Sequence, residues 1–449
     1  IGNAILGSLL AWAVLGRRTR VMTQHLDSAT MPQFFEGRFN SKALKLAASV
    51  LIFIFLIPYT ASLYNGLSRL FGMAFNIDYS VCVIAMAILT AIYVIAGGYM
   101  ATAINDFIQG MIMLVGIIAV VAAVIINHGG LREAIESLSQ VTDPAVSTDP
   151  GAFTSIFGPD PVNLLGVVIL TSLGTWGLPQ MVQKFYAIKD ERAINKGMII
   201  STIFALVVAG GCYFLGGFGR LYSDRLDIAA NGYDSIIPTM LSDLSPILIA
   251  IVVVLVLSAS MSTLSSLVLA SSSTLTLDFI KGTLVKDMSE KKQLLIMRIL
   301  VAVFIVISVV IAIIQYQSNV TFIAQLMGVS WGALAGAFLA PFLYGLYWKK
   351  TTKAAVWVSF ATGLAITLTQ FTLNAVCKIT FENPVLSYFC GSSINAGMLA
   401  MVVGLVLVPA VSLLTRKTRP AGTEEIFACY DRKVVVSVTD SIGKGEEME

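Results

Sequence analysis

The sequence has few charged residues and very few histidines or cysteines. Of its 449 residues only 12% are Asp, Glu, Lys or Arg, and its two histidines are His25 and His128. The five cysteines form no Cys-x-x-Cys motif, which argues against a metal or redox centre. The absence of a P-loop or other nucleotide-binding motif argues against an ATP-driven pump. A net charge of +3 is too small to indicate a nucleic-acid partner.

Long apolar runs dominate the sequence instead. Hydrophobic residues make up 57% of the chain, and the mean hydropathy is +0.84. Runs of about 18 residues or more recur, each long enough to cross the roughly 30 Å hydrocarbon core of a bilayer. The sequence therefore predicts an all-α, polytopic membrane protein. We expect eleven spans, at residues 1–16, 43–75, 80–97, 103–127, 162–188, 197–221, 247–279, 294–314, 321–348, 352–376 and 393–415.

The distribution of Lys and Arg predicts how the chain crosses the membrane, because basic residues concentrate in cytoplasmic segments. If the loop at residues 17–42 is inside, only five of the 29 basic residues lie outside: Arg69, Arg132, Arg220, Arg225 and Lys378. We therefore expect a transmembrane domain at 1–419 in a bacterial inner or plasma membrane. A disordered cytoplasmic tail is expected at 420–449.

One expected span, 247–279, changes from apolar to hydroxyl-rich residues about half-way along its length. Residues 251–257 are wholly apolar, whereas six of the next nine carry a hydroxyl group. Ala259, Ser262 and Thr263 stand at i, i+3 and i+4, so they share one helix face. A backbone carbonyl and two hydroxyls on that face are oxygen ligands of the kind that a small hard cation takes. Close helix packing by small residues is the alternative interpretation.

A second span, 162–188, contains the run Thr171-Ser172-Leu173-Gly174-Thr175-Trp176-Gly177-Leu178-Pro179. Two glycines and a proline within six residues predict a break in the helix near mid-membrane. Non-helical backbone at that depth is tolerated only where protein buries it or where it lines a wet cavity. Discontinuous helices of this kind form binding sites in transporters, because their freed backbone groups face the solute.

The hydroxyl-rich run from Ala259 to Ser265, followed by Ser271-Ser272-Ser273 and Asp278, resembles the sodium-ligand helix of the sodium/solute symporter family. The resemblance extends over the whole chain and is strongest to the family's proline-transporting branch. It implies that Ala259, Ser262 and Thr263 bind Na⁺, and that sodium is the only metal involved.

Two further segments carry the resemblance. The segment Asn105-Asp106-Phe107-Ile108-Gln109 is similar to a family stretch whose Asp lies on the inward sodium route, which implies that role for Asp106. An ordinary helix N-cap is the alternative. The loop Pro32 to Phe39 matches the family's Pro-x-x-Phe-x-x-Arg-Phe pattern. Independently of the family, it reads as a short helix that follows Thr30, with Pro32 in its first turn.

The resemblance also implies a solute pocket beside the broken helix. In the family this helix lines the pocket, together with a tyrosine after a proline kink and a small-residue helix matching 321–348. The implied substrate-binding residues are Tyr59, Thr171, Gly174, Thr175, Trp176, Pro179 and Trp331. Packing alone is the alternative for Tyr59 and for most of 321–348. The chain departs from the proline transporters at Thr171 and Thr175, where they carry aromatic residues, and at Trp176, where Phe is usual. The identity of the solute therefore stays open.

The fold implied is a LeuT-type bundle of two inverted five-helix repeats. Because the chain opens with Ile1 inside an apolar stretch, we expect that the first one or two helices of the fold lie upstream. Cys377 and Cys390 both fall in one outside loop, where an oxidising compartment would permit a disulfide.

The leading functional hypothesis is a sodium-coupled symporter that imports a small organic solute by alternating access, with an amino acid such as proline first. Its partners would be the solute, Na⁺ and the lipid bilayer, with no nucleic acid. The alternatives are a symporter for pantothenate, a monocarboxylate or a sugar, a proton-coupled relative, and a solute sensor without net flux. An enzyme is not expected, because the spans contain no cluster of catalytic groups.

Overall fold

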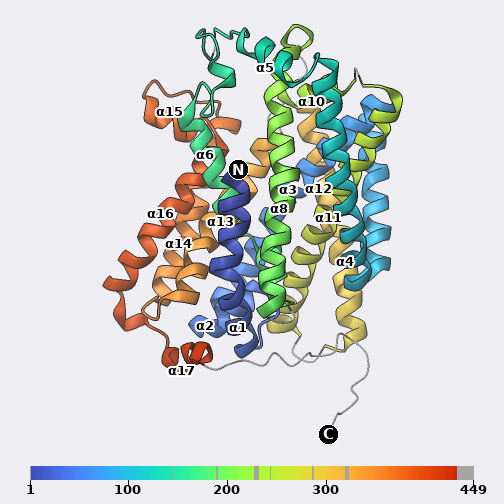
Figure 1. Ribbon diagram of the computed structural model, residues 1–449. Helices are drawn as coiled ribbons and strands as arrows, with labels where there is room; N and C mark the ends of the chain where they lie inside the picture. The colour runs from blue at the N-terminus through green and yellow to red at the C-terminus, as the bar shows by residue number, and fades with distance from the viewer. Residues whose placement is uncertain are drawn as a thin grey trace.

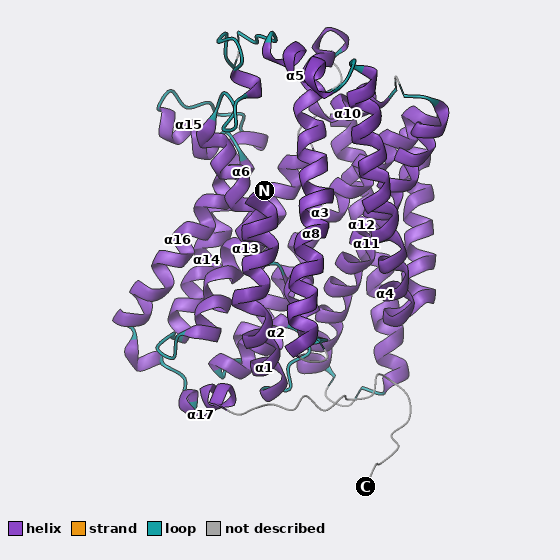
Figure 2. Cartoon of the chain, in the orientation of Figure 1, coloured by secondary structure: helices purple, strands orange, loops and turns teal. Residues whose placement is uncertain are grey.

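The computed structural model describes residues 2–144, 146–188, 191–226, 232–242, 244–285, 288–318 and 323–431. Within these residues every regular element is a helix and no strand is formed (Figure 2). In this described part of the chain, eight helices are long and apolar enough to cross a membrane, and a bent pair, Pro161–Trp176 with Pro179–Tyr186, would make a ninth. Of the other expected spans, 80–97 corresponds to the shorter apolar helix Tyr79–Ile95, and 1–16 to two π-helical segments.

The helices follow one another with short connections. The first half of the chain comprises η1 (Asn3–Leu9), η2 (Trp12–Gly16), α1 (Arg17–His25), α2 (Met31–Phe39), α3 (Lys42–Phe75), α4 (Tyr79–Asn127), α5 (Leu131–Ser139), η3 (Ala152–Thr154), α6 (Pro161–Leu173), η4 (Gly174–Trp176) and α7 (Pro179–Tyr186). The second half comprises α8 (Glu191–Gly217), η5 (Phe218–Arg225), η6 (Tyr233–Ser235), α10 (Ile236–Leu241), α11 (Pro246–Thr274), η7 (Leu275–Leu284), α12 (Glu290–Ser318), α13 (Ile323–Tyr347), α14 (Lys353–Phe371), η8 (Thr372–Val376), α15 (Pro384–Cys390), α16 (Ser393–Leu414), η9 (Arg416–Thr418), α17 (Thr423–Phe427) and η10 (Ala428–Asp431).

The long helices run side by side and separate two ends of the molecule (Figure 1). The short elements α1, α2 and α17 lie at one end, and α5, α10 and α15 lie at the other. The predicted topology makes the first end cytoplasmic, since it carries the loop at 17–42. We call these the inner end and the outer end.

The helix α13 forms the centre of the bundle. Of its most apolar stretch, 89% is buried, and it packs against α3, α14 and α16. Glycines allow its close contacts: a Cβ atom on Gly332 would lie 2.8 Å from the Cα of Gly397, and one on Gly363 only 2.5 Å from the backbone nitrogen of Ala337. Small residues let helix backbones approach in lipid, where no hydrophobic force draws helices together.

The short helix expected after Thr30 is confirmed as α2. Thr30 has extended backbone and its side chain accepts a hydrogen bond from the backbone N–H of Gln33, while Pro32 occupies the first turn. An N-cap of this kind satisfies one of the amides that the first turn leaves without a partner. Phe34 and Phe35 are fully buried and pack against the aromatic rings of Phe342 and Phe338, so α2 is anchored to the inner end of α13.

The prediction of a disordered tail from residue 420 is wrong as far as Asp431, because this segment forms α17 and η10. Phe427 is buried and lies 4.9 Å from the guanidinium of Arg38, whereas the hydroxyl of Tyr430 donates to the carbonyl of Leu346. Burial lowers the pKa of Arg38 to about 10, which leaves it charged at neutral pH. The tail is ordered because its few apolar and aromatic side chains find partners at the inner end. Residues 432–449 lie outside the described residues.

The disulfide considered between Cys377 and Cys390 is not formed. Both are free thiols, and Cys377 is exposed in the loop before α15.

Candidate ion and solute site

The predicted ion ligands lie on one face of α11, as their spacing requires. The hydroxyl of Thr263 donates to the backbone carbonyl of Ala259 at 2.9 Å, so these two oxygens are adjacent. Ser262 and Thr263 are partly buried, whereas Ser260, Leu264 and Ser265 on other faces are buried against neighbouring helices. The hydroxyl of Thr263 needs only to rotate about its side-chain bond to present a lone pair beside that carbonyl.

Asp106 reaches the same face from α4. The hydroxyl of Ser262 lies close to its carboxylate, and the Oδ1 atom of Asp106 has no hydrogen-bond partner. Asp106 lies inside α4 and interacts with α11, so the alternative of a helix N-cap is not what the structure shows. The structure therefore places a carbonyl beside a hydroxyl on α11, and a second hydroxyl of the same helix beside a carboxylate; all of these are oxygen donors suited to a hard cation.

A cavity of about 950 Å³ begins beside Asp106 and extends toward the inner end. Asp106 lines it, and α11 contributes Ser265, Ser266, Leu269, Ala270 and Ser273. Ser266 and Ser273 continue the helix face that carries Ser262, at i+4 and i+11. The loop between α1 and α2 lines the cavity at Ser28 and Ala29. A strip of hydroxyl groups therefore leads along one wall from the ion-ligand residues to the inner end.

The polar face of α7 also lines the cavity, and sequence reasoning missed it. Gln180, Gln183 and Lys184 line the cavity at i, i+3 and i+4. Gln180 is only 4% exposed, and neither atom of its amide group has a hydrogen-bond partner. The hydroxyl of Tyr186, also in the wall, is likewise unpartnered. The spacing of these three polar residues, directly after the break at Pro179, already indicated in the sequence that this helix has a polar face.

Three of the predicted substrate residues meet at one point. The rings of Tyr59 on α3 and Trp331 on α13 are in T-shaped contact, with their centroids 5.7 Å apart. A Cβ atom on Gly174 would lie 3.2 Å from Cε3 of Trp331, so glycine lets the broken helix approach the indole ring. The break itself is confirmed: η4 and α7 follow α6 with a bend of 40°. Pro179 is buried in the first turn of α7, where it lacks the N–H that a helix interior would need.

The other three predicted substrate residues face the first helical segment. The hydroxyl of Thr171 donates to the side-chain carbonyl of Asn3. The hydroxyl of Thr175 donates to the backbone carbonyl of Gly7, and the indole N–H of Trp176 donates to the backbone carbonyl of Leu6. None of the seven predicted substrate residues lines the cavity at the inner end. The structure thus divides six of them between an aromatic contact with α13 and a polar contact with η1, and Pro179 begins α7.

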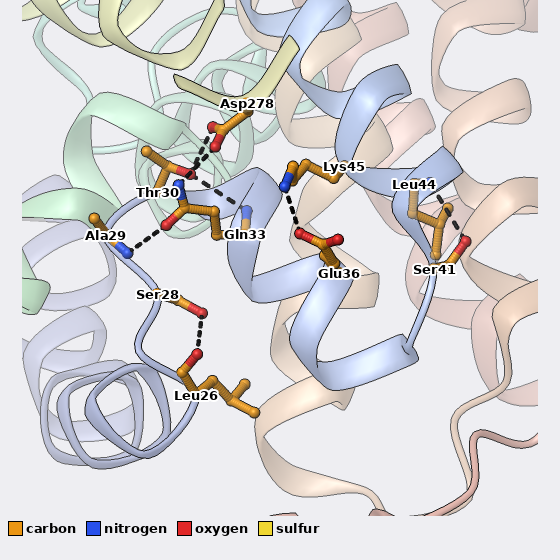
Figure 3. A network of polar contacts seen from close by, with 10 residues as sticks. All are labelled: Leu26, Ser28, Ala29, Thr30, Gln33, Glu36, Ser41, Leu44, Lys45 and Asp278. Atoms are coloured by element: carbon orange, nitrogen blue, oxygen red, sulfur yellow. Dashed lines mark hydrogen bonds and ion pairs between the residues drawn. The ribbon is translucent and has the colours of Figure 1, made fainter. Parts of the chain in front are cut away.

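A second feature that the sequence did not reveal is the environment of Asp278, which follows α11 in η7 (Figure 3). Its carboxylate is fully buried and accepts hydrogen bonds from the hydroxyl of Thr30 and from the side-chain N–H of Gln33, both at 2.7 Å. The Gln33 side-chain oxygen accepts in turn from the backbone N–H of Ala29. Hydrogen bonds to an ionised group are stronger than neutral ones. The network therefore ties α2 to the inner end of the helix that carries the ion ligands.

The chain matches the model of the sodium:solute symporter family over residues 2–363. It is 26% identical over 423 residues to the osmoregulated proline transporter OpuE of Bacillus subtilis strain 168. This alignment covers 93% of this chain and 80% of OpuE. It is 28% identical over 380 residues to the sodium/proline symporter of Staphylococcus aureus, covering 81% of this chain and 70% of that one.

A solved structure of a Na⁺-coupled sialic acid symporter, in its substrate-bound outward-open state, aligns with a TM-score of 0.70 over 92% of this chain and 83% of that one, at 18% identity. The expected LeuT-type helical bundle is therefore confirmed, and the chain is a multi-pass membrane protein. On the family match over most of its length, this protein belongs to the sodium:solute symporter family.

Proposed function

We propose that this protein is a sodium-coupled symporter that imports an amino acid, with proline as the first candidate, by alternating access. The observation that carries the proposal is the set of oxygen atoms on Ala259, Ser262 and Thr263 of α11, together with Asp106, which adjoins Ser262 and lines a cavity leading to the inner end. In this account Na⁺ binds to the carbonyl and the two hydroxyls. Asp106 and the serines of α11 then line its route to the cytoplasm.

The solute, in this proposal, binds where Tyr59, Gly174 and Trp331 meet. An aromatic ring pair offers a flat apolar surface for a small ring, and the backbone of the broken segment offers polar contacts. The names of the relatives in Bacillus and Staphylococcus support proline. Pantothenate, monocarboxylates and sugars are the alternatives that a competition panel separates.

One sodium ion is sufficient to drive such uptake. Entry of one positive charge at 100 mV releases about 2.3 kcal/mol, and a tenfold sodium gradient adds about 1.4 kcal/mol. The sum corresponds to an accumulation of roughly 500-fold for an uncharged or zwitterionic solute. Coupling requires in addition that sodium favour the conformation that binds solute, because a ligand with equal affinity for both states shifts neither.

We place the protein in a bacterial plasma membrane with the inner end, and hence the C-terminal segment, in the cytoplasm. The basic residues of the loop at 17–42 support this orientation through the positive-inside rule.

The test is uptake of labelled solutes into proteoliposomes under an imposed sodium gradient. We expect uptake of proline, and a sodium requirement at least tenfold higher in the double variant Ser262→Ala, Thr263→Ala. The matched control is Ser271→Ala with Thr276→Ala, because these hydroxyls are buried further along the same helical run and also donate to backbone carbonyls.

An unchanged sodium requirement in the first double variant would refute the ion site. Uptake driven equally well by a proton gradient without sodium would favour the proton-coupled alternative. Sodium-dependent binding without any uptake would favour a sensor.

A further inference from the structure

The polar face of α7 is a part of the inner cavity that the sodium route does not use. We use the term inner cavity for the cavity of about 950 Å³ that begins beside Asp106. Gln180, Gln183 and Lys184 line it from one face of α7. Lys184 is exposed, and its charge interacts with that of Asp106. The face therefore offers amide groups and an ammonium group to a molecule that enters the cavity.

Apolar contacts hold α7 in place behind this face. Val182 is fully buried, and the ring of Phe185 is in T-shaped contact with that of Trp12, with the centroids 5.0 Å apart. Pro179 occupies the first turn and fixes the start of the helix directly after the break. Because the apolar side is packed, the residues at i, i+3 and i+4 on the polar side stay directed to the cavity.

The amides of this face lack hydrogen-bond partners within the described part of the chain. Gln180 is only 4% exposed, and neither its side-chain oxygen nor its side-chain nitrogen has a partner. The side-chain nitrogen of Gln183 and the hydroxyl of Tyr186 are also buried and unpartnered. Native structures usually provide a partner for such groups, because leaving them unpaired is costly. These atoms point to a ligand that both accepts and donates hydrogen bonds.

The hydroxyls that α11 contributes to the inner cavity have different properties. Ser265 and Ser266 both donate to the backbone carbonyl of Ser262. Ser273 donates to the backbone carbonyl of Ala270. A hydroxyl that has given its one proton to a carbonyl offers only lone pairs to the cavity. Lone pairs of oxygen suit a cation, whereas an anionic group needs the N–H donors that α7 supplies.

We propose that the polar face of α7 binds the carboxylate of the solute on its way to the cytoplasm, with Gln183 and Lys184 as hydrogen-bond donors. Gln180 adds its N–H to the carboxylate, and its side-chain oxygen accepts from the ammonium group of the same molecule. This inference rests on the proposed function. It adds a second solute site, distinct from the contact of Tyr59 with Trp331.

The site also names the feature that the cargo must have, which is a carboxylate group. Amino acids, pantothenate and monocarboxylates carry one, and a neutral sugar does not. The inference therefore narrows the class of solute as well as placing it on the inner side.

The test measures proline transport separately from each side of the membrane. Right-side-out vesicles, whose lumen is the cytoplasmic side, are loaded with labelled proline, and efflux is followed at equal, saturating sodium on both sides. In the double variant Gln180→Met, Gln183→Met, which keeps the side-chain volume, the KM for luminal proline should rise about tenfold, because hydrogen bonds to a charged group are lost. The KM for external proline should be unchanged, since the contact of Tyr59 with Trp331 is untouched.

A competitor identifies the group that is recognised. Proline amide lacks the carboxylate, so in the unmodified protein it should inhibit efflux from the lumen about tenfold more weakly than unlabelled proline does. This preference should shrink in Lys184→Gln, which keeps a polar side chain and loses the charge that attracts the carboxylate. Because Lys184 is exposed, this variant carries the test if the double variant does not fold.

Two matched controls separate the site from burial and from the cavity itself. Gln370 on α14 is also 4% exposed and its side-chain oxygen is unpartnered, but it does not line the inner cavity. Ser273 lines the cavity, but its hydroxyl donates to its own helix. The variants Gln370→Met and Ser273→Ala should leave the luminal KM and the preference over proline amide unchanged.

The outcomes separate this inference from the proposed function. Sodium-dependent proline flux in the unmodified protein tests the function first; if it is absent, the function fails for proline and the same variants are measured with labelled pantothenate and a labelled monocarboxylate. An equal luminal KM in the unmodified protein and the double variant would mean that water alone satisfies the amides, and it would overturn the inference. A KM raised equally on both sides would overturn it, because the effect would then not be confined to the inner side. Transport of a sugar alone, or of no solute, would overturn it as well.

Discussion

The buried network around Asp278 makes a quantitative prediction about stability. In the variant Thr30→Val the shape of the side chain is kept, but the hydrogen bond to the carboxylate and the N-cap of α2 are both lost. A hydrogen bond to a charged group contributes about 1.5–3 kcal/mol, and an N-cap about 1 kcal/mol. We expect the free energy of unfolding to fall by about 3 kcal/mol.

A matched control exists at the start of α14. Thr352 is also fully buried and also caps its helix, but its hydroxyl pairs with the hydroxyl of Thr415 rather than with a carboxylate. Thr352→Val should therefore cost about 1–2 kcal/mol, the sum of a cap and one neutral hydrogen bond. Both variants are measured by denaturant titration in detergent micelles. Equal losses in the two would refute the claim that the Asp278 charge strengthens the network.

Combined variants test whether the cost comes from leaving the buried Asp278 carboxylate without hydrogen-bond donors. Thr30→Val with Gln33→Leu leaves a fully buried carboxylate without either side-chain donor, and the losses should add to about 5 kcal/mol. Adding Asp278→Val should restore a large part of this loss, because an apolar side chain needs no partner. If the triple variant is as unstable as the double variant, the network owes its effect to packing instead.

Three other predictions follow from particular contacts. Gly363→Ala should lower the free energy of unfolding by about 1–3 kcal/mol, because the Cβ atom of the new alanine would clash with the backbone of α13. Gly210 has open space around it, so Gly210→Ala should leave the free energy of unfolding unchanged or raise it. Gln180→Leu should raise thermal stability and lower transport, since it removes an unpaired buried amide from the inner cavity. The hydrogen bond from Lys349 lowers the pKa of Glu424, so the tail contact should persist at neutral pH and weaken only as the pH falls below 4.5.

Each of these has a direct readout. Unfolding titrations compare the two glycine variants, and equal costs would contradict the close packing of α13 with α14. Thermal denaturation and uptake together decide the role of Gln180, and reduced stability in Gln180→Leu would contradict an unpaired amide. Limited proteolysis of the segment 420–431 across pH follows the tail, and the variant Glu424→Gln should be cleaved equally fast at all pH values.

Sequence patterns correctly predicted those features that depend on interactions between residues close together in the chain. The hydroxyl run on α11 predicted that Ala259 and Thr263 would adjoin, because a helix places i and i+4 on one face. Gly174 and Pro179 predicted the break, and Thr30 with Pro32 predicted the start of α2.

Contacts between distant segments could not be read in this way. Asp278 and Thr30 are 248 positions apart, and nothing in either segment identifies the other as its partner. The same holds for Arg69 and Asp234 at the outer end. The tail was predicted to be disordered from its polar composition, yet Phe427 is buried beside Arg38 and Tyr430 donates to the carbonyl of Leu346, two contacts with segments far away in the sequence.

The most direct test of the central claim is equilibrium binding of radioactive Na⁺ to the purified protein. The account predicts saturable binding that weakens at least tenfold in Thr263→Ala and is unchanged in Thr276→Ala. Equal sodium affinity in the unmodified protein and in Thr263→Ala would contradict an ion site on this face of α11.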